Sequence, residues 1–119
     1  MPTVWIVSDS GHDYSTAKKF GEVSFLYNDK INVFASDKLV KELCAKLQNS
    51  NKNDCVLPSG NSLATCLTFS ILMSKHSMVN MLIYSFRNQM YEVRTILKSQ
   101  FVLFAEEDDN VGNRISTGE

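Results

Sequence analysis

Short β-branched and aromatic runs alternate with helical segments along this chain, and this alternation limits its possible folds more than any other feature. Residues 3–7, Thr-Val-Trp-Ile-Val, have the composition of a buried strand and run directly into a turn-rich loop. A short helix over residues 14–20, stopped by a left-handed Gly21, and a strand over residues 22–27 are predicted next. A strand–helix–strand order of this kind is typical of a sheet with parallel strands.

A second helix is predicted from Ser36, as its N-cap, to about residue 48, with Asp37 in the first turn. Its apolar positions recur at the helical period and indicate packing by one face on a sheet; they are Leu39, Val40, Leu43, Cys44 and Leu47.

The second half of the chain continues this alternation and then changes it. Residues 54–57 form an apolar run, and the segment 62–76 after it is apolar nearly all round, which predicts a strand and a buried helix. The strand-like runs 79–86 and 90–97 are separated only by Arg-Asn-Gln, the length of a hairpin connection. We therefore expect a three-layer, Rossmann-like α/β fold, with a mainly parallel sheet of about five strands and a C-terminal antiparallel hairpin.

The chain is expected to form one α/β domain over residues 1–104, followed by an acidic, flexible tail over residues 105–119. Its 119 residues, with 44% hydrophobic and 21% charged side chains, suit a single domain. The tail carries Glu106 to Asp109 and little that could be buried. The apolar run Phe101–Phe104, at a predicted sheet edge, indicates self-association through the C-terminal strand region.

The cysteines and the net charge limit the cellular compartment and the classes of binding partner that are expected. Cys44, Cys55 and Cys66 are odd in number and lie in apolar stretches, which predicts reduced, buried thiols. Because neither a signal peptide nor a membrane span is evident, a soluble, cytoplasmic protein is expected. A formal net charge of −1 disfavours nucleic acid as a partner, because such proteins usually carry excess Lys and Arg.

Two loops are expected to carry the function. In an open α/β sheet, ligands bind beyond the carboxyl ends of the strands, where neighbouring connections leave to opposite faces. If the strand 3–7 lies between 22–27 and 54–57, the loops Ser8–Asp13 and Pro58–Ser62 flank that crevice. The predicted ligand-binding residues are Ser10, Gly11, Ser59, Gly60, Asn61 and Ser62.

The second loop suits an anion, because Gly60 permits close backbone approach and the following helix would present free N–H groups. It matches neither a Walker A loop nor a GxGxxG motif. The alternative is structural: Asn61 or Ser62 caps the helix, and Gly60 turns the chain.

The first loop gathers Asp9, His12 and Asp13, which are the candidate acid–base residues if the protein is an enzyme. Alternatively, Asp13 caps the short helix and His12 makes a loop hydrogen bond. Partners for a metal are missing, no GxSxG elbow occurs, and we expect neither a metal nor a cofactor.

Aromatic residues on the predicted strands could form a stacking platform for bases, but core packing is the expected role. These residues are Trp5, Phe25, Tyr27, Tyr84 and Phe86.

Residues 9–21, Asp-Ser-Gly-His-Asp-Tyr-Ser-Thr-Ala-Lys-Lys-Phe-Gly, followed by a strand, resemble a family of small, uncharacterised proteins encoded by tailed bacteriophages. The resemblance continues through residues 57–60, Leu-Pro-Ser-Gly, the helix ending Lys75-His76 and the strand 79–84, so it covers roughly residues 3–95. The family usually has glycine after the histidine, where this chain has Ser77.

The resemblance brings no established activity, catalytic residue or cofactor, and it implies a phage protein in the host cytoplasm. The favoured hypothesis is a non-catalytic accessory protein that binds a host protein or a host signalling nucleotide. One alternative is an enzyme that processes nucleotides or phosphate esters with the Ser8–Asp13 and Ser59–Ser62 loops. Another alternative is a nucleic-acid-binding module.

Overall fold

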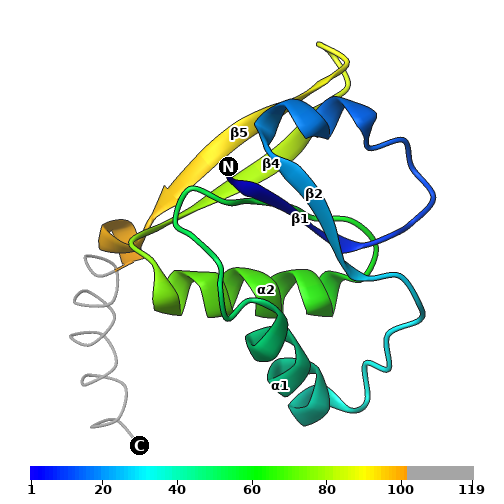
Figure 1. Cartoon of the computed structure of the whole chain (residues 1–119), viewed down its shortest axis with the longest axis vertical. Helices are drawn as coiled ribbons and strands as arrows, with labels where there is room; N and C mark the ends of the chain where they lie inside the picture. The colour runs from blue at the N-terminus through cyan, green and yellow to red at the C-terminus, as the bar shows by residue number, and fades with distance from the viewer. Residues whose placement is uncertain (102–119) are drawn as a thin grey trace, which may run out of the picture.

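The computed structural model describes residues 1–101 of the chain. The predicted tail 105–119 and most of the Phe101–Phe104 run lie outside the described residues, so the domain boundary stays a prediction. The elements, in chain order, are β1 (Thr3–Ser8), η1 (Ser15–Phe20, a 3₁₀ helix), β2 (Glu22–Tyr27), α1 (Ser36–Lys46), β3 (Cys55–Leu57), α2 (Ser62–Lys75), β4 (Met78–Ser85) and β5 (Met90–Leu97) (Figure 1).

The strands form one sheet in the order β2-β1-β3-β4-β5. β1 pairs in parallel with β2 and β3, β3 pairs in parallel with β4, and β4 and β5 form an antiparallel hairpin. The predicted α/β class, the mainly parallel sheet and the terminal hairpin are therefore confirmed. The chain moves outward from β1 to β2 and then crosses back to β3, so the order reverses between β1 and β3.

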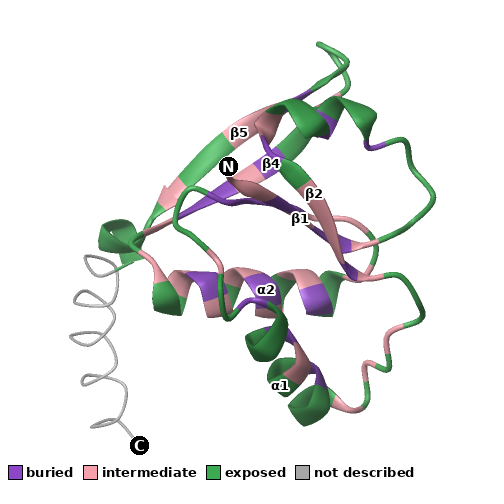
Figure 2. Ribbon diagram, in the orientation of Figure 1, coloured by how far each residue is buried: buried purple, intermediate pink, exposed green. Residues whose placement is uncertain are grey.

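Helices cover the two faces of the sheet unequally. α1 and α2 pack on one face, around a core that includes Val7, Leu43, Leu47 and Val56. The other face carries η1 and a second core, which includes Val4, Ile6, Tyr14, Ala17, Leu57 and Tyr91. Figure 2 shows that burial follows the middle of the sheet and the sheet-facing sides of the helices, while the far end of the hairpin is exposed.

Several local predictions are corrected by the structure. Ser36 is the first helical residue rather than the cap, and Ala35 precedes it without a side-chain capping bond. Gly21 has φ +154° rather than an αL conformation, and a Cβ there would overlap the backbone carbonyl of Pro2. Glycine at this position therefore permits a close approach between two chain segments instead of a left-handed helix stop.

The cysteine prediction holds for only one thiol. Cys55 is buried, and burial raises the pKa of its thiol, whereas Cys44 and Cys66 are exposed. Cys44 and Val40 lie at the margin of the α1 stripe, whose buried members are Leu39 and Leu43 and, directly after the helix, Leu47.

The long helix α2 is also less buried than predicted. It fully buries only the stripe Ala64, Thr68 and Leu72, because one face of it meets the sheet. Between Met1 and Phe101, no helix combines the length and the apolar character needed to cross a membrane.

Candidate functional site

The sheet order brings the two predicted loops together. Because β1 lies between β2 and β3, the loop after Ser8 and the loop after Leu57 leave the carboxyl ends of neighbouring strands. A hydrogen bond of 2.7 Å between the Oγ atoms of Ser10 and Ser59 joins the loops directly. The two loops expected to flank the crevice at the reversal of strand order are therefore neighbours.

The close contact between the loops depends on Gly60. Its φ is +82°, and a Cβ placed on it would lie 2.6 Å from the Ser8 Oγ and 2.8 Å from the Ser8 Cβ. The second loop can therefore pass over the end of β1 only with glycine at this position.

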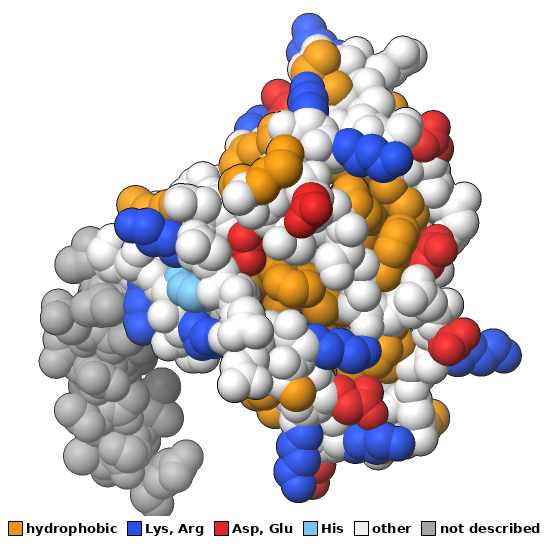
Figure 3. All heavy atoms as spheres, in the orientation of Figure 1, with side chains coloured by type: hydrophobic (Ala, Val, Ile, Leu, Met, Phe, Trp, Pro, Cys, Tyr) orange, Lys and Arg blue, Asp and Glu red, His pale blue; other side chains and the backbone are white. Residues whose placement is uncertain are grey.

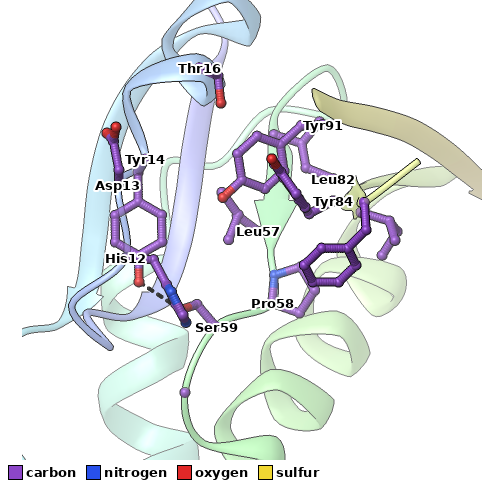
Figure 4. Close-up of a pocket in the computed structure, with 13 residues that line it drawn as sticks. His12, Asp13, Tyr14, Thr16, Leu57, Pro58, Ser59, Leu82, Tyr84 and Tyr91 are labelled. Carbon is purple, nitrogen blue, oxygen red and sulfur yellow. Dashed lines mark hydrogen bonds between the residues drawn. The ribbon is translucent and has the colours of Figure 1, made fainter. Parts of the chain in front are cut away.

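Three hydroxyl groups form a cluster where the loops meet. The Tyr14 Oη lies 2.8 Å from the Ser59 Oγ (Figure 4). It also lies 3.0 Å from the Ser10 Oγ and accepts a 3.0 Å hydrogen bond from the Ser10 N–H. Burial raises the pKa of Tyr14, but hydrogen bonds from Ser10 and Ser59 outweigh burial, so its pKa is lowered overall. The cluster fixes both loops and presents hydroxyl groups to the crevice.

A pocket of about 560 Å³ opens beside this cluster, between the η1 side of the crevice and the β4–β5 hairpin (Figure 4). One wall is formed by His12, Asp13, Tyr14 and Thr16. The second wall and the base are formed by Leu57, Pro58, Ser59, Gly60, Leu82, Ile83, Tyr84, Phe86 and Tyr91.

Three aromatic rings dominate the hairpin side of the pocket. Tyr84 and Tyr91 are directly opposite in the β4–β5 register, and their ring centroids lie 5.2 Å apart in an edge-to-face arrangement. Tyr84 makes the same arrangement with Phe86, also at 5.2 Å. Burial, followed by the nearby Tyr14, raises the pKa of the Tyr91 hydroxyl.

The expectation that the strand aromatics form the core is wrong for two of them. Trp5, Phe25 and Tyr27 pack against the cores, but Tyr84 is 39% exposed and Phe86 is 86% exposed. The hairpin extends beyond the helices, so its outer rings have no second layer to pack against.

Both carboxylates of the first loop stabilise local turns. The Asp9 Oδ1 accepts from the Gly11 N–H at 3.0 Å, and the Asp13 Oδ1 accepts from the Ser15 N–H at 2.9 Å. The second bond lowers the pKa of Asp13. The structural alternative for Asp13, an N-cap of the short helix, is wrong, because Tyr14 is the N-cap of η1 and makes no side-chain capping bond. Asp13 instead closes a turn that ends at Ser15, the first residue of η1.

In the second loop, Asn61 also has a structural role. The Asn61 side chain accepts from the Ala64 N–H at 2.9 Å and caps α2, and Ser62 is the first residue of the helix. Asn61 therefore uses a backbone donor that a bound anion would need.

Of the three candidate acid–base residues, His12 and Asp13 line the pocket, whereas Asp9 does not. Throughout residues 1–101, no cluster of three His, Cys, Asp or Glu side chains has the arrangement needed to hold a metal ion. Roles of these residues in catalysis or binding stay predictions.

A family model described as phage Pam3 gp32-like protein matches residues 2–96. The chain belongs to this family. The match agrees with the resemblance to phage proteins seen in the sequence, and it spans every residue that lines the pocket. No curated protein and no solved structure matches the chain.

Tyr14, Tyr84 and Tyr91 all line the pocket. The sequence did not identify Tyr14 or Tyr91 as site residues. Tyr14 directly follows Asp13, a candidate residue of the first loop, within the motif 9–21. Tyr91 could have been found by writing out the hairpin register, which sets it opposite Tyr84.

Proposed function

We propose that this phage protein is a non-catalytic accessory protein that binds a small nucleotide of the host, and that its pocket receives the base. The observation that carries the proposal is the position of the aromatic pocket. Its Leu57–Gly60 wall runs from the end of β3, at the carboxyl edge of the sheet where folds of this strand order bind ligands.

The walls of the pocket suit a flat heterocycle. Exposed rings of Tyr84 and Phe86 offer faces on which a base can stack, and such stacking contributes about 1–3 kcal/mol per base. The hydroxyl groups of Tyr14 and Ser59, which line the pocket, can donate to or accept from the edge of the base. A volume of about 560 Å³ is in the usual range for small-molecule sites.

Charge decides which part of the nucleotide is recognised. The lining residues include no Lys or Arg, and the lysines and arginines on the face drawn in Figure 3 are dispersed among acids. Asn61 already occupies one N–H group at the start of α2. The pocket therefore recognises base and sugar, and the phosphates stay in solvent.

Binding is favoured over catalysis because the carboxylates of the first loop accept hydrogen bonds from backbone N–H groups. Asp13 stabilises the start of η1 and Asp9 stabilises the turn before it. A general base must reach the proton that it removes, and these carboxylates already hold backbone N–H groups.

Calorimetric titration with a panel of nucleosides and nucleotides tests the proposal. We expect binding of at least one base, with similar affinity for the nucleoside and its monophosphate. Phe86→Ala should weaken binding about tenfold or more, because a stacking surface is lost. Phe34→Ala is the matched control, since Phe34 is 96% exposed and lies outside the pocket lining.

If no member of the panel binds, nucleotide recognition is excluded. Turnover of a bound nucleotide, lost on replacing His12 or Asp13, would instead support the enzyme alternative.

A second candidate is binding of a host protein, favoured by the exposure of Phe86. Its side chain is 86% exposed beside the hairpin turn, and large aromatic side chains frequently anchor protein interfaces. Crosslinking in host lysate, compared between the unmodified protein, Phe86→Ala and Phe34→Ala, distinguishes the two candidates. A crosslinked host protein that disappears only in Phe86→Ala would support this function.

A further inference from the structure

A second feature of the structure is the outer edge of β5, which has no partner strand among residues 1–101. β5 is the last strand of the sheet, and its eight residues pair only with β4 among the residues that the structure describes (Figure 1). An unpaired strand edge is a template for another strand.

The register shows which backbone groups face outward from β5. The Lys98 N–H donates to the Ser77 carbonyl at 2.9 Å, next to the Met78–Leu97 pair. Hydrogen-bonded and non-hydrogen-bonded pairs alternate along an antiparallel ladder. Residues 90, 92, 94 and 96 therefore bond to β4, and the backbone groups of residues 91, 93, 95 and 97 face outward. The Leu97 N–H agrees with this assignment, since it donates to Gln100 Oε1 rather than to β4.

The charged side chains along this edge are self-complementary: an acidic and a basic residue lie at equal distances on either side of Val93. Glu92 and Arg94 project from one face of β5, on either side of Val93, and form an exposed ion pair at 3.6 Å. In an antiparallel pairing of two β5 strands centred on Val93, Glu92 of each copy stands opposite Arg94 of the other. The Val93 N–H and C=O groups then bond to those of the second copy, and Tyr91 pairs with Thr95.

Charge and hydrogen bonding exclude three other two-fold registers, which are centred on Glu92, Arg94 and Thr95. Centring the pairing on Glu92 or on Arg94 sets like charges directly opposite each other, which destabilises a strand pair. Centring it on Thr95 requires the outward N–H of Leu97, which Gln100 already occupies. Of these four registers, only the Val93-centred one pairs the outward backbone groups and also sets opposite charges against each other.

We propose that β5 is a self-association edge, at which two copies of this chain join antiparallel around Val93 into one continuous sheet. The two copies are related by a two-fold axis, so the same surface is used on both. The two Glu92–Arg94 ion pairs between copies set the register.

Sedimentation equilibrium at low salt, from micromolar to millimolar protein, tests this proposal through a charge swap. We expect a monomer–dimer equilibrium in the unmodified chain. Glu92→Lys and Arg94→Glu should each weaken dimerisation about tenfold or more, because each places like charges opposite in both pairs. The double variant E92K/R94E restores opposite charges in the same register and should restore the dimer.

Two substitutions at Val93 test the backbone part of the proposal. Val93→Pro removes an outward N–H that does not bond to β4, and proline is accepted on edge strands in that position. It should abolish the dimer, whereas Val93→Thr, which keeps the N–H and the β-branched shape, should retain it.

A chain that remains monomeric over the whole concentration range overturns the proposal, and Glu92 and Arg94 then only protect the edge from association. It is also overturned if both single charge variants dimerise as well as the unmodified chain. Recovery of the dimer in the double variant supports it even if Val93→Pro does not fold.

Discussion

Replacing Gly60 with alanine should measure how strongly the contact between the two loops depends on glycine. Two costs add in this variant. Alanine at φ +82° carries backbone strain of about 1–2 kcal/mol. Its Cβ would lie 2.8 Å from the Ser8 Cβ, and relieving such overlap typically costs about 1–3 kcal/mol. The free energy of unfolding should therefore fall by about 2–5 kcal/mol.

The strain and the overlap can be separated by changing Ser8. Ser8→Gly removes both atoms that Gly60→Ala would meet, so the double variant keeps the strain and loses the overlap. We expect the double variant to be more stable than the sum of the single effects by about 1–3 kcal/mol. Ser8→Ala removes only the Oγ, and it should recover a smaller part.

Urea denaturation followed by the fluorescence of Trp5, the single tryptophan of the chain, gives these free energies. If the changes in unfolding free energy caused by Gly60→Ala and Ser8→Gly simply add, the argument is refuted, because the alanine Cβ at position 60 would then not overlap the Ser8 side chain. A Gly60→Ala variant as stable as the unmodified protein would also refute it.

Two further measurements test the hydrogen bonds of a buried carboxylate, Asp54, and of Tyr27 at the end of β2. Asp54 is buried and accepts hydrogen bonds of 2.9–3.0 Å from the N–H groups of Thr3 and Asn51 and from the Trp5 Nε1–H. Asp54→Ala should therefore lower the free energy of unfolding by about 3 kcal/mol or more, with a change in Trp5 emission, and a loss below about 0.5 kcal/mol would contradict this role. Burial and a hydrogen bond to Glu42 raise the pKa of Tyr27 from 10.0 to about 12. Because the folded-state pKa is the higher one, this stabilisation is complete below pH 10 and is lost as the pH rises through about 12. Tyr27→Phe should flatten the alkaline decline in stability measured by urea denaturation between these pH values, and an unchanged decline would show that other groups cause it.

Local patterns in the sequence were sufficient for the elements and their order. The strand at residues 22–27 was predicted with the bounds that the structure gives, and the hairpin connection was placed correctly between the last two strands. Helix boundaries were less accurate, because Ser36 and Gly21 were assigned roles that depend on backbone angles. Those angles follow from contacts with distant segments, such as the approach of Pro2 to Gly21.

The position of the crevice could be predicted, but its chemistry could not. The sequence left strand order open. On the assumption that the strand 3–7 lies between 22–27 and 54–57, it set the Ser8–Asp13 loop beside the loop containing Ser59, and the structure has this order. The aromatic wall was missed because Tyr84 and Phe86 have the composition of core residues. Exposure depends on whether a second layer covers them, and residue type does not encode that.

By itself, the sequence determined that this chain is an α/β protein with a terminal hairpin and two polar loops, because periodicity and turn residues act over a few neighbouring positions. Only the tertiary structure decided that Tyr14 joins Ser10 to Ser59 and faces Tyr91 across a pocket. It also decided which side of β5 has no partner strand among residues 1–101. Both depend on segments brought together by the sheet from distant parts of the chain, and no local pattern records which segments these are.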